Sequence, residues 1–139
     1  MDIVNEIFGE YNDICNRIIE LNYKALTIRS SLTSVRAINY EQIRTSNNPS
    51  LIAKIQTIDN LEKEIKSLGI KKKNIYDSLI EMISKLSNEK YKCILRCTYL
   101  LHMDVNEVLD IIDISANHFY KLKKKALNEL YKIYIDSKW

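Results

Sequence analysis

One stretch of the sequence, from Asp104 to Leu130, reads D-V-N-E-V-L-D-I-I-D-I-S-A-N-H-F-Y-K-L-K-K-K-A-L-N-E-L. Asp104 is predicted to cap a first helix, and Glu107 follows at the spacing of a capping box. Asp113 falls in the turn, where Asp tolerates a left-handed backbone better than most residues. Ser115 is then predicted to cap a second helix. The stretch therefore predicts two helices joined by a short turn, which is a helix-turn-helix.

The second predicted helix, from Ser115 to Tyr134, has an apolar side and a polar side. Its apolar residues recur at steps of three and four, as expected for a helix face packed on a core. They are Phe119, Leu122, Ala126, Leu130 and Ile133. The candidate binding residues on the other side are Ser115, Ala116, Asn117, His118, Tyr120, Lys121, Lys123, Lys124 and Lys125. His118 is either a ligand contact or a solvated residue of the first turn.

Charge separates the two predicted helices. Between Ser115 and Tyr134, five lysines against one glutamate give +4, whereas Asp104 to Asp113 carries four carboxylates and no basic residue, in a chain of net charge +3. A basic face attracts the phosphates of duplex DNA. Asn and Lys near a helix start also suit base edges in the major groove. We therefore expect double-stranded DNA as the partner; the alternative is a lysine-rich solvated face of a helical bundle.

The same stretch resembles region four of bacterial sigma factors, without a gap from Asp104 to Leu130. The likeness ends in Lys125-Ala126-Leu127, followed by Leu130. The upstream segment from Tyr91 to Leu101, Y-K-C-I-L-R-C-T-Y-L-L, resembles the helix that precedes that motif. The whole chain is similar to small phage proteins of the autolysin-regulator (ArpU) type, which regulate late transcription.

The resemblance implies roles for individual residues. In region four the first residues of the second helix contact promoter DNA, and the matching positions here are Ala116, Asn117, His118, Tyr120 and Lys121. RNA polymerase is implied as a possible further partner. Two departures bear on these roles. Leu109 stands in the middle of the first helix, where the family often has a small residue. The first turn of the second helix has fewer Arg residues than that of a sigma factor, so the DNA sequence bound is expected to differ from that of a sigma factor.

Composition predicts an all-α protein. With 2 Gly and 1 Pro in 139 residues, the chain has few of the turn residues that a sheet-rich protein needs. No stretch approaches the roughly 20 apolar residues of a membrane span, and the acidic start is unlike a signal peptide. We therefore expect no membrane partner and a cytoplasmic protein, and the resemblance to phage regulators implies a bacterial host in which the protein is nucleoid-associated.

Neither catalysis nor a cofactor is expected. The chain has no Gly-rich phosphate loop and no set of Ser, His and acid residues at a known catalytic spacing. Its cysteines are Cys15, Cys93 and Cys97. This odd number suggests reduced thiols, and nothing completes a zinc site with them. We predict a protein that is not an enzyme.

The N-terminal part, residues 1–87, is predicted to be a long helical hairpin that also mediates oligomerisation. Apolar residues follow a strict heptad seam, which favours a coiled coil. The seam consists of Val4, Ile7, Tyr11, Ile14, Ile18, Leu21, Ala25, Ile28 and Leu32, and Phe8, Cys15 and Ile19 widen it. Because the seam is longer than a hairpin needs, we expect a homodimer. A monomer in which the second helix covers the seam is the alternative.

The second long helix is predicted from about Leu51 to Leu86, after a loop at 33–49 that ends with Asn48 as a cap and Pro49 as the first helical residue. Its periodicity passes through Gly69, so we expect one continuous helix, with a stop at Gly69 as the alternative. Asn88 is then predicted to cap a helix from about Glu89 to Leu101. Residues 88–139 would form a three-helix module, with Ile94, Leu95, Thr98 and Leu101 facing its core.

The sequence thus predicts long antiparallel helices followed by a helix-turn-helix, in a regulator that binds promoter DNA, in phage or prophage late genes. Two rival functions fit the same pattern. A small subunit of a DNA-packaging machine would assemble into a large ring, so its mass in solution would distinguish it. A structural coiled coil would show no salt-dependent binding of DNA.

Overall fold

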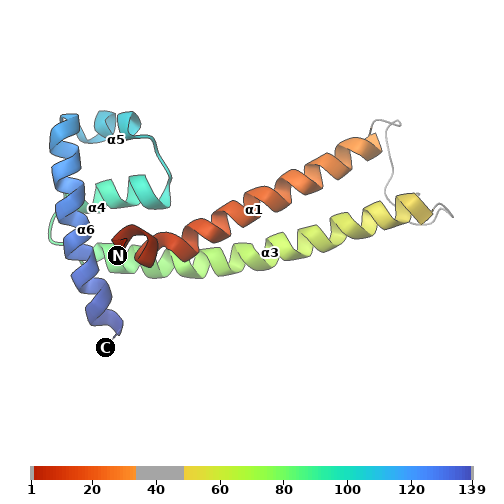
Figure 1. The fold of residues 1–139 in the computed structure, drawn as a ribbon, viewed down its shortest axis with the longest axis horizontal. Coiled ribbons are helices and arrows are strands. Elements are labelled where there is room, and N and C mark those ends of the chain that lie inside the picture. The colour runs from red at the N-terminus through yellow and green to blue at the C-terminus, as the bar shows by residue number, and fades with distance from the viewer. Residues whose placement is uncertain (1, 34–48, 139) are drawn as a thin grey trace. The chain divides into compact units, whose positions relative to one another are not determined.

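The computed structural model describes residues 2–33 and 49–138, and over these ranges the chain is helical with no strand (Figure 1). This confirms the predicted all-α class. The elements are α1 (Ile3–Thr33), α3 (Pro49–Ser84), α4 (Glu89–Leu95), the π-helix η1 (Arg96–Leu100), α5 (Val105–Ile112) and α6 (Ala116–Lys138). None of the helices in the described ranges combines the length and apolarity needed to span a membrane.

Contacts along the chain define two compact units. One consists of Met1–Asn12 together with Asn74–Trp139, and the other of Asp13–Lys73. We refer to them as the terminal unit and the hairpin unit. The domain boundary predicted at residues 87 and 88 falls inside the terminal unit. The first residues of the chain therefore belong with the C-terminal helices.

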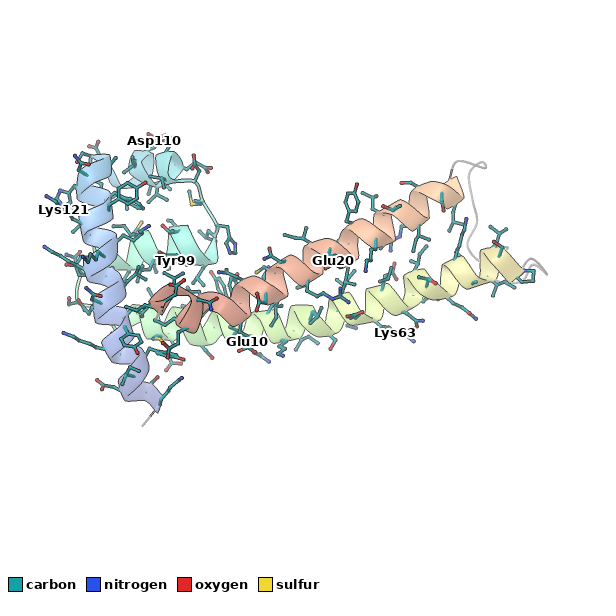
Figure 2. All side chains as sticks on the ribbon, viewed as in Figure 1. Glu10, Glu20, Lys63, Tyr99, Asp110 and Lys121 are labelled. Atoms are coloured by element: carbon teal, nitrogen blue, oxygen red, sulfur yellow. The ribbon has the colours of Figure 1, made fainter. Side chains whose placement is uncertain are left out.

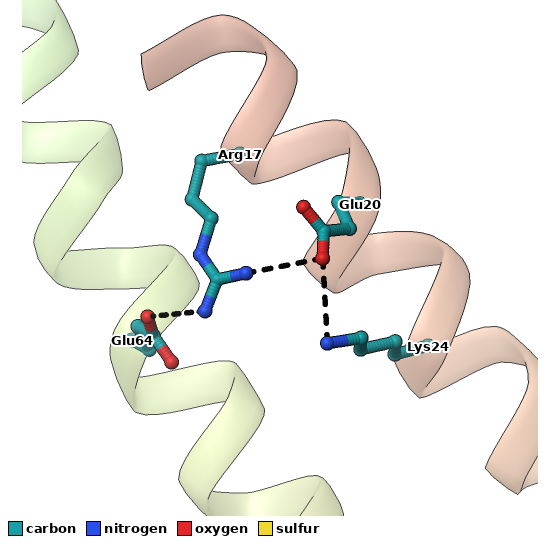
Figure 3. A network of polar contacts seen from close by, with 4 residues as sticks. All are labelled: Arg17, Glu20, Lys24 and Glu64. Carbon is teal, nitrogen blue, oxygen red and sulfur yellow. Dashed lines mark hydrogen bonds and ion pairs between the residues drawn. The ribbon is translucent and has the colours of Figure 1, made fainter. Parts of the chain in front are cut away.

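Apolar packing and ion pairs between its two helices hold the hairpin unit together. Leu32 of α1 is buried against Ile55 and Ile58 of α3. Arg17 pairs with Glu64 at 3.3 Å, and Arg29 pairs with Glu62 (Figure 3 shows the first pair). All four charged side chains are substantially exposed, so each pair stabilises the unit by only about 0–1 kcal/mol. Burial of the apolar residues is therefore the larger contribution.

The predicted heptad seam of α1 is covered within one chain. Of its nine residues, six are buried and three are half-buried. The buried residues are Ile7, Tyr11, Ile14, Leu21, Ala25 and Leu32, and the half-buried ones are Val4, Ile18 and Ile28. The seam therefore does not require a second copy of the chain, and our reason for predicting a homodimer is wrong. Ile19, which was expected to widen the seam, is 66% exposed.

The second long helix, α3, runs without interruption from Pro49 to Ser84. Gly69 lies inside it with no positive φ, which confirms continuity over the alternative of a stop. Pro49 is the first helical residue, as predicted. The predicted cap Asn48 and the loop at 34–48 lie outside the described residues.

In the terminal unit, Asn88 caps the start of α4, as predicted. The side-chain oxygen of Asn88 accepts a hydrogen bond from the Lys90 N–H at 2.8 Å, and α4 follows. The carboxylate of Glu129 on α6 accepts hydrogen bonds from the Ser87 N–H at 2.7 Å and from the Ser87 hydroxyl at 3.0 Å. These bonds hold the start of α4 against α6.

The helix predicted to run regularly to Leu101 instead becomes a π-helix. The Leu101 N–H bonds to the carbonyl of Arg96, five residues earlier, at 3.0 Å. This wider turn shifts the helical phase by one residue, so Cys97 and Leu100 are buried and Leu101 is 57% exposed. The prediction that Leu101 faces the core is wrong, whereas Ile94 and Leu95 are fully buried as expected.

The first turns of α1 pack on the end of η1. The ring of Phe8 stacks on that of Tyr99 with centroids 4.8 Å apart. The Tyr11 hydroxyl donates to the Leu100 carbonyl at 3.2 Å, which satisfies an oxygen left free at the helix end. His102 follows in the left-handed conformation, with φ of 53°, and its Nε2 lies 2.9 Å from the side-chain oxygen of Asn12.

Candidate nucleic-acid interface

The turn between α5 and α6 has the predicted local chemistry. Asp113 adopts the left-handed conformation, with φ of 58° and ψ of 55°, and its N–H donates to the Leu109 carbonyl at 2.8 Å. The hydroxyl of Ser115 accepts a hydrogen bond from the His118 N–H at 3.2 Å, so Ser115 caps α6 as predicted. Leu109 is half-buried against a cluster formed by Ile94, Cys97, Val108 and Phe119.

The cap of α5 is only partly as predicted. Asp104 occupies the N-cap position with extended backbone, and its carbonyl accepts from the Val108 N–H at 3.1 Å. Its side chain accepts no capping hydrogen bond. The carboxylate therefore remains at the surface, where it adds to the negative charge of α5.

The buried side of α6 fixes its orientation. Phe119, Ala126 and Leu130 are fully buried, and Leu122 and Ile133 are half-buried. Phe119 joins a cluster with Ile94, Cys97 and Val108, which come from α4, η1 and α5. All five predicted apolar positions therefore lie on the packed side of the helix.

The opposite side of α6 is exposed where the binding residues were predicted. Ala116, Asn117, His118, Tyr120, Lys121, Lys124 and Lys125 are all exposed. A depression of about 400 Å³ is lined by Ser115, Asn117, His118, Lys121, Leu122 and Lys125. Figure 2 shows Lys121 on the side of α6 turned away from α4. The structure thus brings five of the nine predicted site residues together around one concave surface.

Lys123 is placed differently from its neighbours. It is half-buried, and its Nζ lies 5.7 Å from the centroid of the Phe119 ring and 5.2 Å from that of the Tyr120 ring. These are cation–π distances. Tyr120 in turn packs edge-on against Phe119, with centroids 5.3 Å apart. Lys123 therefore covers the aromatic pair and is less available to an anionic ligand.

The exposed charges of this surface are not neutralised locally. Lys121, Lys124 and Lys125 form no ion pair within the described residues. The same holds, in the described part of the chain, for the carboxylates of Asp104, Glu107, Asp110 and Asp113. Between Lys121 and Lys132 of α6, Glu129 is the one acidic residue, and its oxygens accept hydrogen bonds from Ser87. The basic surface and the acidic surface thus remain open to charged partners.

Two supporting contacts of this site were missed by sequence reasoning. Glu129 anchors α6 to the start of α4 through Ser87, 42 residues away, and Tyr11 supports η1 from 89 residues away. No local pattern signals either contact. The cation–π contact of Lys123 with Phe119 does have a signal, because residues four apart on a helix are neighbours.

Cys15, Cys93 and Cys97 are free in the structure. The Sγ atoms of Cys93 and Cys97 lie 3.8 Å apart, and burial, followed by the neighbouring thiol, raises the pKa of Cys97 above its ordinary value. Residues 2–33 and 49–138 contain no group of three or more His, Cys, Asp or Glu side chains arranged to hold a metal ion.

Fold and surface define an all-α protein with a basic helix exposed at its C-terminal end. A family model described as "Protein of unknown function (DUF1492)" matches residues 42–131. The chain belongs to this family, and the match includes α3, α4, η1, α5 and most of α6. Searches of curated proteins and of solved structures gave no match.

Proposed function

We propose that this protein is a sequence-specific DNA-binding transcription regulator, in which α5, the turn and α6 act as a helix-turn-helix. The observation that carries the proposal is the exposed start of α6. Asn117, Lys121 and Lys125 line one depression there, and the helix is anchored from behind by the fully buried Phe119. In known helix-turn-helix proteins, the N-terminal residues of the second helix contact base edges in the major groove.

Charge supports DNA over other partners. The exposed lysines of α6 have no ion-pair partner within the described residues, so their positive charge is available to phosphates. The resemblance of Asp104 to Leu130 to sigma factor region four supports a promoter as the DNA target. The similarity to autolysin-regulator proteins supports phage or prophage late genes. Such a protein would work at the nucleoid, in the cytoplasm of a bacterial host.

RNA polymerase is proposed as a protein partner through α5. The helix presents exposed carboxylates at Glu107 and Asp110, and the next residue, Ile111, is 56% exposed. Asp110 points away from α4 (Figure 2). An acidic face with an apolar residue suits a basic protein surface. We also propose that two copies bind together, which would suit half-sites about 34–36 Å apart.

The test has two stages. Capture of genomic DNA fragments with the purified full chain would first identify a binding site. Titrations of variants against that site and a scrambled duplex, at several salt concentrations, would then assign roles. Asn117→Ala and Lys121→Ala should each lower discrimination between the two duplexes by about 1–3 kcal/mol. Lys124→Ala should weaken both alike and reduce the salt slope by about one.

Lys66→Ala is the matched control, because Lys66 is an exposed lysine on α3 in the hairpin unit. It should leave both affinities and the salt slope unchanged. If Asn117→Ala and Lys121→Ala bind the identified site as tightly as the parent chain, α6 is not the recognition helix. If the parent shows no salt-dependent binding to any DNA, a structural role replaces the proposed one.

A further inference from the structure

The outer face of α1 in the hairpin unit carries three exposed apolar side chains. Ile19 is 66% exposed, Tyr23 71% and Leu26 58%. Their spacing of four and three residues puts them on one stripe of the helix. Single exposed apolar residues are ordinary, but a contiguous patch marks an interaction surface. The buried seam lies on a different side of α1, so this stripe has no partner among the described residues.

A hollow borders this stripe. It has a volume of about 520 Å³ and is lined by residues of both helices of the hairpin unit, which are Tyr23, Lys24, Thr27, Ile28, Thr57 and Leu61. Tyr23 belongs to both features and so joins the stripe to the hollow. A knob of apolar side chains next to a hole of this kind is the geometry by which helices interlock.

The pattern of α1 is self-complementary about one point. In an antiparallel pair of identical helices, a residue faces the position equally far on the other side of the crossing point. A crossing beside Asn22 and Tyr23 brings Ile19 of each copy opposite Leu26 of the other. At that crossing Ile19 also reaches the level of the partner's hollow, between Lys24 and Ile28. The apolar stripe of one copy would then lie level with the hollow of the other.

The charged residues that flank the stripe are centred within half a residue of the same point. Glu20 lies 3.2 Å from Arg17 and 3.4 Å from Lys24 within one chain (Figure 3), and both Glu20 and Lys24 remain about half exposed. The pKa of Glu20 is lowered below its ordinary value, first by the hydrogen bond from Lys24 and then by the charges of Arg17 and Lys24. The midpoint between positions 20 and 24 is position 22, so the same crossing brings Glu20 of one copy beside Lys24 of the other. A parallel pair in register would instead place each charged residue level with the same residue of the other copy.

We propose that a second copy of this chain docks on this face, as an antiparallel two-fold pair centred beside Tyr23. This proposal rests on the proposed binding of two copies to DNA, and it adds the surface through which the two copies contact each other. It replaces the heptad seam, which is buried in one chain. Stable complexes usually bury about 800 Å² on each partner, and a stripe of three side chains beside one hollow offers less. The dimer is therefore expected to dissociate in the micromolar range.

Sedimentation equilibrium of the full chain without DNA tests the proposal. The parent should show a monomer–dimer equilibrium. Ile19→Asn and Tyr23→Ser should each raise its dissociation constant at least tenfold. Ile70→Asn is the matched control, because Ile70 is 59% exposed on α3 and belongs neither to the stripe nor to the hollow. This control should leave the constant unchanged, and circular dichroism should show native helicity for every variant.

A charge exchange tests the antiparallel direction. Glu20→Lys and Lys24→Glu should each weaken the dimer, and the double variant should restore at least part of the loss. A parent that stays monomeric throughout the micromolar range would overturn the proposal, as would a larger ring, or an equal effect of Ile19→Asn and Ile70→Asn. Salt-dependent DNA binding by a monomeric chain would overturn this surface alone and leave the proposed regulator standing.

Discussion

Lys123 and Lys124 are neighbours in sequence, but their ammonium groups have different surroundings. Lys123 lies over the rings of Phe119 and Tyr120, whereas Lys124 is exposed and without an ion-pair partner in the described part of the chain. A cation held against aromatic faces contributes about 0.5–1 kcal/mol at a surface site. If the Lys123 side chain turned toward a phosphate, this cation–π contact would be lost. The two lysines should therefore divide between packing and DNA binding.

We predict that Lys124→Gln reduces the salt slope of DNA binding by about one and leaves stability unchanged. Lys123→Gln should have a smaller effect on the slope and should lower the free energy of unfolding by roughly 0.5–1 kcal/mol. Titrations at several salt concentrations and urea unfolding of the same proteins measure both quantities. Equal changes in slope for the two variants would show that Lys123 leaves the rings to contact phosphate.

At the scale of single residues, the sequence predicts most where the physical cause is local. The left-handed Asp113 and the cap Ser115 depend on the chemistry of one side chain and its nearest peptide groups, and both were predicted. The capping hydrogen bond expected of the Asp104 side chain is absent. The partner of Glu129 could not be predicted, because Ser87 is brought to it only by the packing of α4 on α6.

Among the helices, the π-helix η1 is the clearest departure from the predicted pattern. The spacing of apolar residues from Tyr91 to Leu101 suits a regular helix, and no Gly or Pro interrupts it. The extra residue in the turn becomes favourable through tertiary contacts, because Tyr11 donates to the Leu100 carbonyl and Phe8 stacks on Tyr99. These partners come from the start of the chain. Local periodicity therefore predicted the helix but could not predict its change of phase.

In α3, Gly69 lowers the helix propensity at a position where the fold does not require a glycine. Its φ is not positive, and a Cβ added there would meet no atom within 4 Å. We predict that Gly69→Ala stabilises the protein by about 1 kcal/mol, because Ala has the higher helix propensity and restricts the unfolded chain. Thermal and urea unfolding measure this gain.

Gly9 provides the comparison, since it also lies inside a helix. A Cβ there would approach the side-chain oxygen of Asn5 to 2.9 Å, so that exposed side chain would have to move. Gly9→Ala should therefore gain less than Gly69→Ala. A loss of stability from Gly69→Ala would mean that a conformation other than a continuous α3 is present in solution.

Across the whole molecule, one helix serves two units. The apolar seam of α1 continues without a break from Val4 to Leu32, so the sequence gives no sign that its packing partners change. The structure assigns its residues up to Asn12 to the terminal unit and those from Asp13 onward to the hairpin unit. The predicted boundary at residue 87 followed a gap between helices. Gaps of this kind mark the ends of elements, whereas units are defined by tertiary contacts.

Phe8 and Leu21 should therefore have different effects, although both are buried residues of α1, at 0% and 1% exposure. Replacing either by Ala should cost about 2–5 kcal/mol, from lost burial and the cavity left behind. Phe8→Ala removes the stack on Tyr99, so amide hydrogen exchange should rise mainly in η1, α5 and α6. Leu21→Ala should raise exchange mainly in residues 13–33 and 49–73. Mass spectrometry of peptides from both proteins makes the comparison, with exchange of the parent chain as the reference.

If Phe8→Ala raises exchange only in the hairpin unit, the N-terminal residues do not support the C-terminal helices in solution. A matching rise across both units for both variants would instead mean that the chain opens as one cooperative body, because the helices that pass between the units would then transmit the loss of either anchor.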